Sequence, residues 1–387
     1  MSAAPDGVHL RRAGSDAVLL DCGSLERALE VLHRLSVARD AGTLDVDELV
    51  PAAQTVLVRG GEARGPRGFA DRLSALIEGA GTEGGLADPM PETVIPVRYD
   101  GLDLAEVAEI AGMSAEQVVE RHLAARYTVA FTGFAPGFAY LSGGDPALVV
   151  PRRSTPRPRI DAGSVGLAGP FSAVYPRQSP GGWQLIGRTA SSMWDLDRDP
   201  PALLLPGNRV RFVPEREAVK VSGDATTEAP STRTGPAGGS GPAGAVALEV
   251  VDPGLQTLVQ DRGRPGLAAM GVSASGAADR QALAAVNRLV GNDGKAPALE
   301  LGIGEFSAKA AADVVLALTG APRTGAITGP DGSRPVPYGR VFAVAAGESL
   351  TLEAPSRGFR TVLAIRGGVD VPLVLGSASR DTLAGLG

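Results

Sequence analysis

The sequence is poor in the residues from which covalent cross-links and metal sites are built. Its 387 residues include a single cysteine, Cys22, which excludes an internal disulfide and every multi-cysteine metal site. The three histidines, His9, His33 and His122, are scattered along the chain and form no histidine-based metal motif. We therefore expect no metal site.

Long hydrophobic runs and an excess of positive charge are also missing. No apolar stretch reaches the length of a membrane span, and no basic leader followed by an apolar run opens the chain, which predicts a cytoplasmic protein. The net charge of -6 at pH 7 argues against nucleic acid or an anionic membrane surface as a partner.

Glycine and proline, by contrast, are abundant. The 52 glycines and 30 prolines supply many turns, while 44% of the residues are hydrophobic, enough for packed cores. Short apolar runs between turns favour barrels or sandwiches. We predict a mainly β chain with an α+β domain over 1–93, a β-barrel over 94–215, a flexible linker over 216–245 and a second β module over 246–387. The linker is predicted because it contains almost only small and polar residues, which cannot form a core.

Two consecutive short helices are predicted just before the barrel. Asp103 with Glu106, and Ser114 with Gln117, have the spacing of capping boxes, and Gly112 lies where the first helix must end.

The most informative stretch is 131–189, where four arginines alternate with prolines that stiffen the chain. A guanidinium group on a stiff loop suits bidentate capture of a carboxylate or phosphate. A solvated basic loop between strands is the plain alternative. The four arginines are Arg152, Arg153, Arg157 and Arg159.

Three motifs in this stretch, GFAPGFAYL, PR…PR…GSV and YP…SPGGW…IGRT, resemble the B subunit of bacterial ATP-dependent 5-oxoprolinase, a family also described as a sporulation-kinase inhibitor and a carboxyltransferase subdomain. The resemblance runs over roughly 8–215 and implies a cyclophilin-like β-barrel. The sequence departs from the family pattern at Asp161, where proline is usual, and at Asn208, where aspartate is usual.

The second module contains VDPGLQTLVQDRGRPG, GVSASGAADRQALAAVNRLVGN, ALELGIGEF and IRGGVDVPLVLGSASRD, which resemble the C subunit of the same enzyme. The resemblance covers 246–387, about the first half of such a protein, so we expect a truncated, partial second cyclophilin-like barrel. The apolar runs Val362–Ile365 and Val369–Leu375 have no later segment to pair with and predict an open sheet edge.

Candidate site residues follow from these motifs. No catalytic residue is fixed: His122 lies on an apolar helix face, which favours a core histidine; Asp279 is equally suited to an N-cap; and Asp261 lies on a turn after an apolar strand. The candidate substrate- or phosphate-binding residues are Arg152, Arg157, Arg159, Ser164, Tyr175, Gly181, Gly182, Trp183 and Arg188 in the first module, and Gln260, Arg264 and Ser275 in the second.

The resemblance implies a fused B–C component of 5-oxoprolinase, which opens the lactam of 5-oxo-L-proline to L-glutamate. ATP and Mg²⁺ are then expected at the level of the assembled enzyme, with a separate A subunit, since this chain carries no Walker A loop. Two other functions remain open: a biotin-dependent carboxyltransferase related to urea amidolyase, although the chain has no biotin-attachment site, and a regulator that binds a histidine kinase. A helix-turn-helix rhythm over 104–123 suggests DNA binding, but Glu116 and Glu120 would repel phosphate.

Overall fold

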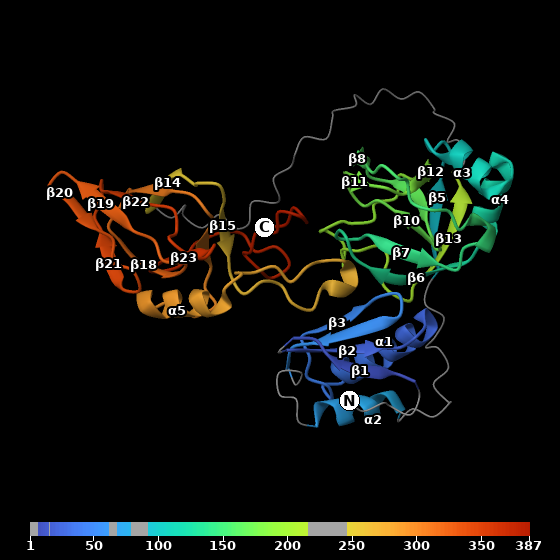
Figure 1. Cartoon of the computed structure of the whole chain (residues 1–387), viewed down its shortest axis with the longest axis horizontal. Coiled ribbons are helices and arrows are strands. Elements are labelled where there is room, and N and C mark those ends of the chain that lie inside the picture. Colours follow the sequence, from blue (N-terminus) through green and yellow to red (C-terminus); the bar gives the residue numbers. More distant parts are fainter. Residues whose placement is uncertain (1–6, 15, 62–67, 79–91, 216–245) are drawn as a thin grey trace. The chain divides into compact units, whose positions relative to one another are not determined.

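The computed structural model describes residues 7–14, 16–61, 68–78, 92–215 and 246–387, and these fall into two compact units (Figure 1). The first unit holds the described residues up to Glu215 together with Pro265–Ser273, and the second holds the remainder. Strands dominate both units, so the prediction of a mainly β chain is confirmed. The predicted linker over 216–245 lies outside the described residues.

A four-stranded sheet with two helices forms the N-terminal part of the first unit. The strand order is β1-β2-β4-β3, all antiparallel. Alternating side chains of the strands and one face of each helix form its core, with Leu20, Leu35, Val56 and Leu73 fully buried. The elements are β1 (His9–Arg12), β2 (Ala17–Asp21), α1 (Leu25–Asp40), β3 (Glu48–Pro51), β4 (Thr55–Arg59) and α2 (Phe69–Glu78).

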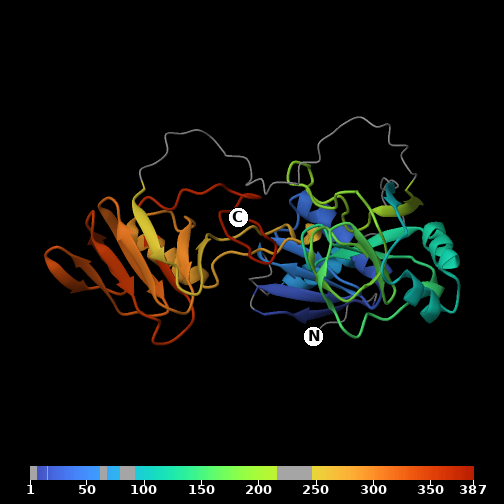
Figure 2. The same ribbon diagram turned by 90° about the horizontal axis from the view of Figure 1, so that it is seen from above.

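Two short helices, α3 (Leu104–Ala111) and α4 (Ala115–Ala124), lie side by side next to the barrel strands (Figures 1 and 2). The predicted capping box of α4 is confirmed, because Ser114 and Gln117 each hydrogen bond to the other's backbone N–H. Gly112 ends α3 in the left-handed conformation, as predicted. The capping box predicted at Asp103 is wrong: its side chain makes no bond to the start of α3.

A nearly closed barrel forms the rest of the first unit. Its seven strands run in the order β12-β9-β10-β7-β6-β13-β5, and a bridge between Arg98 and Arg188 joins the two ends. Gly187 permits this closure, because a Cβ there would lie 2.6 Å from the carbonyl oxygen of Arg98. The strands are β5 (Glu92–Val97), β6 (Tyr127–Thr132), β7 (Ala139–Ser142), β9 (Ser164–Ala168), β10 (Phe171–Val174), β12 (Gln184–Arg188) and β13 (Arg209–Pro214); β8 (Arg157–Ile160) and β11 (Ser179–Gly181) form a separate ribbon, and η2 (Pro146–Leu148) is a 3₁₀ turn.

The second unit consists of two five-stranded antiparallel sheets that share one hydrophobic core, with a helix along one of them. The run Val362–Ile365, predicted to lack a partner, lies in a strand paired on both sides, so that expectation is wrong. The sheets are β14-β17-β22-β19-β20 and β15-β16-β23-β18-β21. The elements are β14 (Leu248–Asp252), β15 (Thr257–Gln260), η3 (Ala268–Met270), α5 (Arg280–Val290), β16 (Ala298–Leu301), β17 (Phe306–Ala310), β18 (Val314–Gly320), β19 (Gly325–Gly329), β20 (Gly332–Pro335), β21 (Val341–Val344), β22 (Ser349–Leu352) and β23 (Thr361–Ile365); of these, η3 belongs to the first unit.

Candidate functional site: an arginine over an aromatic cluster

The arginine-rich loop is held in place by a buried carboxylate. Asp103, 2% exposed, accepts both terminal nitrogens of Arg157 at 2.9 and 2.6 Å and one from Arg153 at 2.9 Å. It also accepts the backbone N–H of Leu185 at 2.7 Å. The pair with Asp103 raises the pKa of Arg157. The prediction that Arg157 clamps a ligand is therefore corrected: its fork already holds an internal carboxylate.

The other two outer arginines predicted to bind an anion extend into solvent. The side chain of Arg159 is 70% exposed and lies 3.2 Å from Asp161, while that of Arg188 is 62% exposed and lies 2.6 Å from Asp100. Exposed pairs of this kind contribute about 0–1 kcal/mol. Ser164 lies opposite Arg188 in the pairing of β9 with β12.

Arg152 differs from its neighbours, because its exposed guanidinium lies over the indole ring of Trp183, 5.9 Å from the ring centroid. Burial raises the pKa of Tyr140, and the charge of Arg152 and a hydrogen bond from it oppose this rise. Burial likewise raises the pKa of Tyr175 to about 12, with Arg152 acting in the opposite direction. Arg152 thus sits beside two protonated phenols and above an aromatic face.

Packed rings form the floor beneath Arg152. Phe138 contacts Tyr175 and Trp183 edge-to-face at 5.2 and 5.5 Å, and Tyr140 meets Trp183 at 5.5 Å. Gly181 is required by this cluster, since a Cβ there would collide with the hydroxyl oxygen of Tyr175. Nothing comparably close surrounds Gly182, where a Cβ would meet the nearest atom at 3.7 Å. A rigid floor with one exposed guanidinium above it is suited to holding a small planar carboxylate.

In the second unit, Asp261 anchors a turn. It accepts hydrogen bonds from the hydroxyls of Ser377 and Ser379, both at 2.6 Å, and from two backbone N–H groups. Burial opposes ionisation of Asp261, but these bonds prevail and lower its pKa. With its oxygens occupied, Asp261 has the surroundings of a structural carboxylate.

Arg264 and Gln260 lie beside this turn, and each retains an unused polar atom. Arg264 is 2% exposed and donates to the carbonyl oxygens of Val374 and Ser379, and Gln260 donates to that of Arg380. The Nη1 of Arg264 and the Oε1 of Gln260 have no hydrogen-bond partner among the described residues. Burial lowers the pKa of Arg264. Buried donors and acceptors are normally paired, so these two atoms are the candidates for ligand contact in this unit.

Two other predicted residues have local roles. Asp279 is the N-cap of α5, accepting the N–H of Ala282 at 2.8 Å, which is the N-cap alternative raised by the sequence. Ser275 has a φ of 52° and donates to Asp381 at 2.9 Å.

His122 is a core residue. It has no exposed surface, and its two ring nitrogens lie 2.7 Å from the Tyr99 hydroxyl and 3.0 Å from the Ser172 hydroxyl. Burial lowers its pKa from 6.5 to about 3, so the ring is neutral at ordinary pH. The interpretation as a core histidine is confirmed.

Within the described ranges, no three His, Cys, Asp or Glu side chains are placed to hold a metal ion together. Among those same residues, no helix is both long and apolar enough to cross a bilayer.

The family model for the carboxyltransferase domain, subdomain C and D, matches residues 8–204. This chain belongs to that family. A second model, the carboxyltransferase domain, subdomain A and B, matches residues 270–387 of the same chain. The two carboxyltransferase regions therefore follow one another in a single polypeptide, as the resemblance implied.

Curated relatives match each half of this carboxyltransferase chain separately. The 5-oxoprolinase B subunit of Escherichia coli O157:H7 is 53% identical over 128 residues, 32% of this chain and 59% of that protein. The 5-oxoprolinase C subunit of Escherichia coli K12 is 41% identical over 140 residues, 36% of this chain and 44% of that protein. The chain thus spans about half the length of each curated relative.

A solved structure extends over both halves. The crystal structure of TTHA0988 superposes on this chain with a TM-score of 0.78 and 33% sequence identity. The match covers 98% of this chain and 72% of TTHA0988. The similarity therefore includes the order of the two carboxyltransferase regions as well as each region alone.

Three residues of the candidate site were not identified from the sequence: Asp103, which holds the loop, Phe138, which packs against Tyr175 and Trp183, and Tyr140, which contacts Arg152. Phe138 and Tyr140 lie inside the GFAPGFAYL motif, so the sequence indicated the importance of this segment but not the roles of these two residues. Asp103 carried only a local signal, the spacing to Glu106, and that signal indicated the wrong role.

Proposed function

We propose that this chain is a component, with fused B- and C-subunit regions, of an ATP-dependent 5-oxoprolinase, which opens 5-oxo-L-proline to L-glutamate with a separate A subunit. The observation that carries the proposal is the double match: one half resembles a protein named as the B subunit of 5-oxoprolinase, and the other half a protein named as its C subunit. Two subunits that act together are natural candidates for fusion into one chain.

The site around Arg152 fits such a substrate. 5-Oxoproline is a small, flat ring with one carboxylate and one amide. We assign the carboxylate to the exposed guanidinium of Arg152, which lies over Trp183. In the second unit, Arg264 and Gln260 are a separate candidate for contact with a polar ligand, because each retains a buried polar atom without a partner among the described residues.

An amide is stabilised by resonance and reacts slowly with water. ATP with Mg²⁺ would supply activation of the amide carbonyl when bound to the assembled enzyme. We place the nucleotide on the A subunit, because the motifs that cradle phosphates are missing from this sequence. The role of this chain is then to bind and orient the lactam.

The function is tested by reconstitution. The purified chain should form no glutamate from 5-oxoproline and ATP, whereas addition of an A subunit and a full-length C subunit should restore activity. Glutamate release by the chain alone would contradict this division of labour. An assembled but inactive complex would overturn the function itself.

Replacing Arg152 with alanine should raise the KM for 5-oxoproline about tenfold, equivalent to about 1.4 kcal/mol, with kcat changed far less. The reason is that the carboxylate is bound in the same way before and during the reaction. Steady-state kinetics of the reconstituted enzyme measure both constants. The matched control is Arg126→Ala, which removes an arginine that is 63% exposed and 3.8 Å from its carboxylate partner. Equal KM values for the two variants would show that Arg152 does not bind the substrate, but they would not contradict the proposed reaction.

A second candidate function is carboxyl transfer. "Urea amidolyase" of Saccharomyces cerevisiae is 36% identical over 142 residues, although these are 8% of that protein. Such chemistry requires a biotinylated carrier and a biotin carboxylase. Incorporation of labelled bicarbonate into urea by the chain with such a carrier, a biotin carboxylase and ATP, without any reaction of 5-oxoproline, would favour this candidate.

A further inference from the structure

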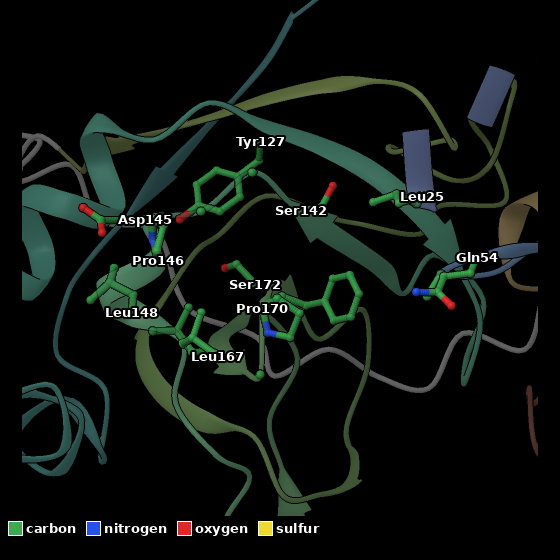
Figure 3. Close-up of a pocket in the computed structure, with 16 residues that line it drawn as sticks. Leu25, Gln54, Tyr127, Ser142, Asp145, Pro146, Leu148, Leu167, Pro170 and Ser172 are labelled. Atoms are coloured by element: carbon green, nitrogen blue, oxygen red, sulfur yellow. The ribbon is translucent and has the colours of Figure 1, made fainter. Parts of the chain in front are cut away.

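A pocket of about 390 Å³ opens on the first unit away from the arginine site (Figure 3). It is bounded by the loop that follows β7, by the turn between β9 and β10, and by Leu25 and Gln54 of the N-terminal part. Its walls are largely apolar, with Leu148, Leu167 and Phe171 contributing side chains. Neither Arg152 nor Trp183 is among the residues that line it, so it is separate from the proposed substrate site.

One polar group in this pocket lacks a partner. Tyr127 is 2% exposed, and its hydroxyl makes no hydrogen bond to any described residue. In Figure 3 the hydroxyl is turned toward the end of the pocket formed by Asp145 and Pro146. Its ring is fixed from behind by Phe212 and His122, each 5.3 Å away between ring centroids. A buried hydroxyl without a partner is costly, which indicates a place where a ligand supplies the bond.

The other hydroxyls and the one charge in the lining are already engaged. Ser142 donates to the carbonyl oxygen of Thr128, and Ser172 donates to that of Gly166. Asp145 lies 2.8 Å from Arg121 and also accepts the N–H of Ala147 at 2.8 Å. The sixteen described lining residues include this one acidic group and no basic group. An anionic ligand would therefore meet no cation here, only a carboxylate.

Protonation makes the free hydroxyl a hydrogen-bond donor. Burial raises the pKa of Tyr127, so the phenol keeps its proton over the whole physiological range. A carbonyl oxygen of a ligand can accept this hydrogen bond. The rest of the ligand should be apolar, because the remaining walls of the pocket are largely apolar.

We propose that this pocket binds a neutral, largely apolar small molecule whose carbonyl oxygen accepts a hydrogen bond from Tyr127. The ligand differs in charge class from the carboxylate assigned to Arg152. The pocket is thus a second small-molecule site on the same unit, and the inference does not depend on which reaction the assembled enzyme performs.

The experiment compares two probes that differ in one hydrogen-bond acceptor, cyclohexanone and methylcyclohexane, by ligand-observed NMR titration of the full chain. Cyclohexanone should bind saturably, and Tyr127→Phe should weaken its binding about three- to tenfold, the ratio expected for one net hydrogen bond. The variant removes only the hydroxyl, so the binding of methylcyclohexane, which accepts no hydrogen bond, should not be weakened by it. The variant should fold, because it removes a buried hydroxyl that makes no bond in the described chain.

A filling variant locates the binding. Ala53 lines the pocket from the turn between β3 and β4, and Ala53→Phe should block both probes. Its neighbour Ala52 is not part of the lining, so Ala52→Phe is the matched control and should leave binding unchanged. No saturable binding of cyclohexanone, cyclohexanone binding that Tyr127→Phe leaves unchanged, or binding insensitive to Ala53→Phe would overturn the proposal. Binding of cyclohexanecarboxylate as tight as that of cyclohexanone would also overturn it.

Discussion

Replacing Asp103 with alanine is expected to destabilise the first unit by about 3–5 kcal/mol, the cost of breaking a buried ion pair from one side. Two guanidinium groups would lose their shared carboxylate, and the N–H of Leu185 would lose its acceptor. The side chains of Arg153 and Arg157 are only 27% and 22% exposed, so water cannot fully replace the lost partner. Urea unfolding followed by tryptophan fluorescence measures the effect, because Trp183 and Trp194 both lie in this unit.

The control for Asp103 is Glu106, an exposed carboxylate that also pairs with Arg153. Glu106 lies 2.9 Å from Arg153, as Asp103 does, but its side chain is 48% exposed. Glu106→Gln should therefore cost no more than about 1 kcal/mol. A loss for Asp103→Ala no larger than that for Glu106→Gln would show that the carboxylate does not hold the loop.

The comparison of Asp103 with Ser114 shows which features the sequence could reveal. Both residues precede a helix and are followed three positions later by an acidic or amide side chain, so both have the pattern of a capping box. Ser114 forms one, because its short hydroxyl reaches the N–H of Gln117. Asp103 does not, because the two arginines supply stronger, charge-assisted bonds. Local spacing cannot reveal a partner some fifty residues away.

The same limit explains the errors at the arginine loop and in the second unit. The sequence indicated a stiff basic loop correctly, but which arginine faces solvent depends on where Asp103 lies in the fold. The run Val362–Ile365 was predicted to lack partners, because no strand that could pair with it was expected after it in the sequence. In the structure β23 lies between β16 and β18, both earlier in the chain. Strand order within a sheet is set by long-range packing, which hydrophobic runs do not encode.

The burial of His122 could be predicted from the sequence, because a position on the apolar face of a helix is a local signal. The structure adds the surroundings: Tyr99 and Ser172 on its two nitrogens, and the ring of Phe212 at 4.5 Å. The arrangement serves a neutral ring, in which one nitrogen accepts from Tyr99 and the other donates to Ser172. A proton added to this ring would displace the first bond and leave a charge in the core.

Acidification is therefore expected to destabilise the first unit through His122. Burial lowers its pKa from 6.5 to about 3. Below pH 6.5, His122 is therefore protonated in the unfolded chain but stays neutral in the folded chain. Stability from this residue is fully present above pH 6.5 and declines by about 1.4 kcal/mol for each pH unit below it, until the folded pKa is reached. Between pH 7 and pH 4.5 the loss should amount to about 3 kcal/mol.

The contribution of His122 is isolated by difference, since carboxylates elsewhere also respond to acid. His122→Gln keeps a donor and an acceptor near Ser172 and Tyr99 but cannot titrate, so its unfolding free energy should fall by about 3 kcal/mol less than that of the parent chain over the same pH interval. The tyrosines beside the ring, Tyr99 and Tyr127, do not interfere, because burial raises the pKa of each. Urea unfolding of both proteins at pH 7 and pH 4.5, followed by tryptophan fluorescence, supplies the four values. Parallel losses in the two proteins would mean that His122 is protonated in the folded state as readily as in the unfolded one, in contradiction to its burial.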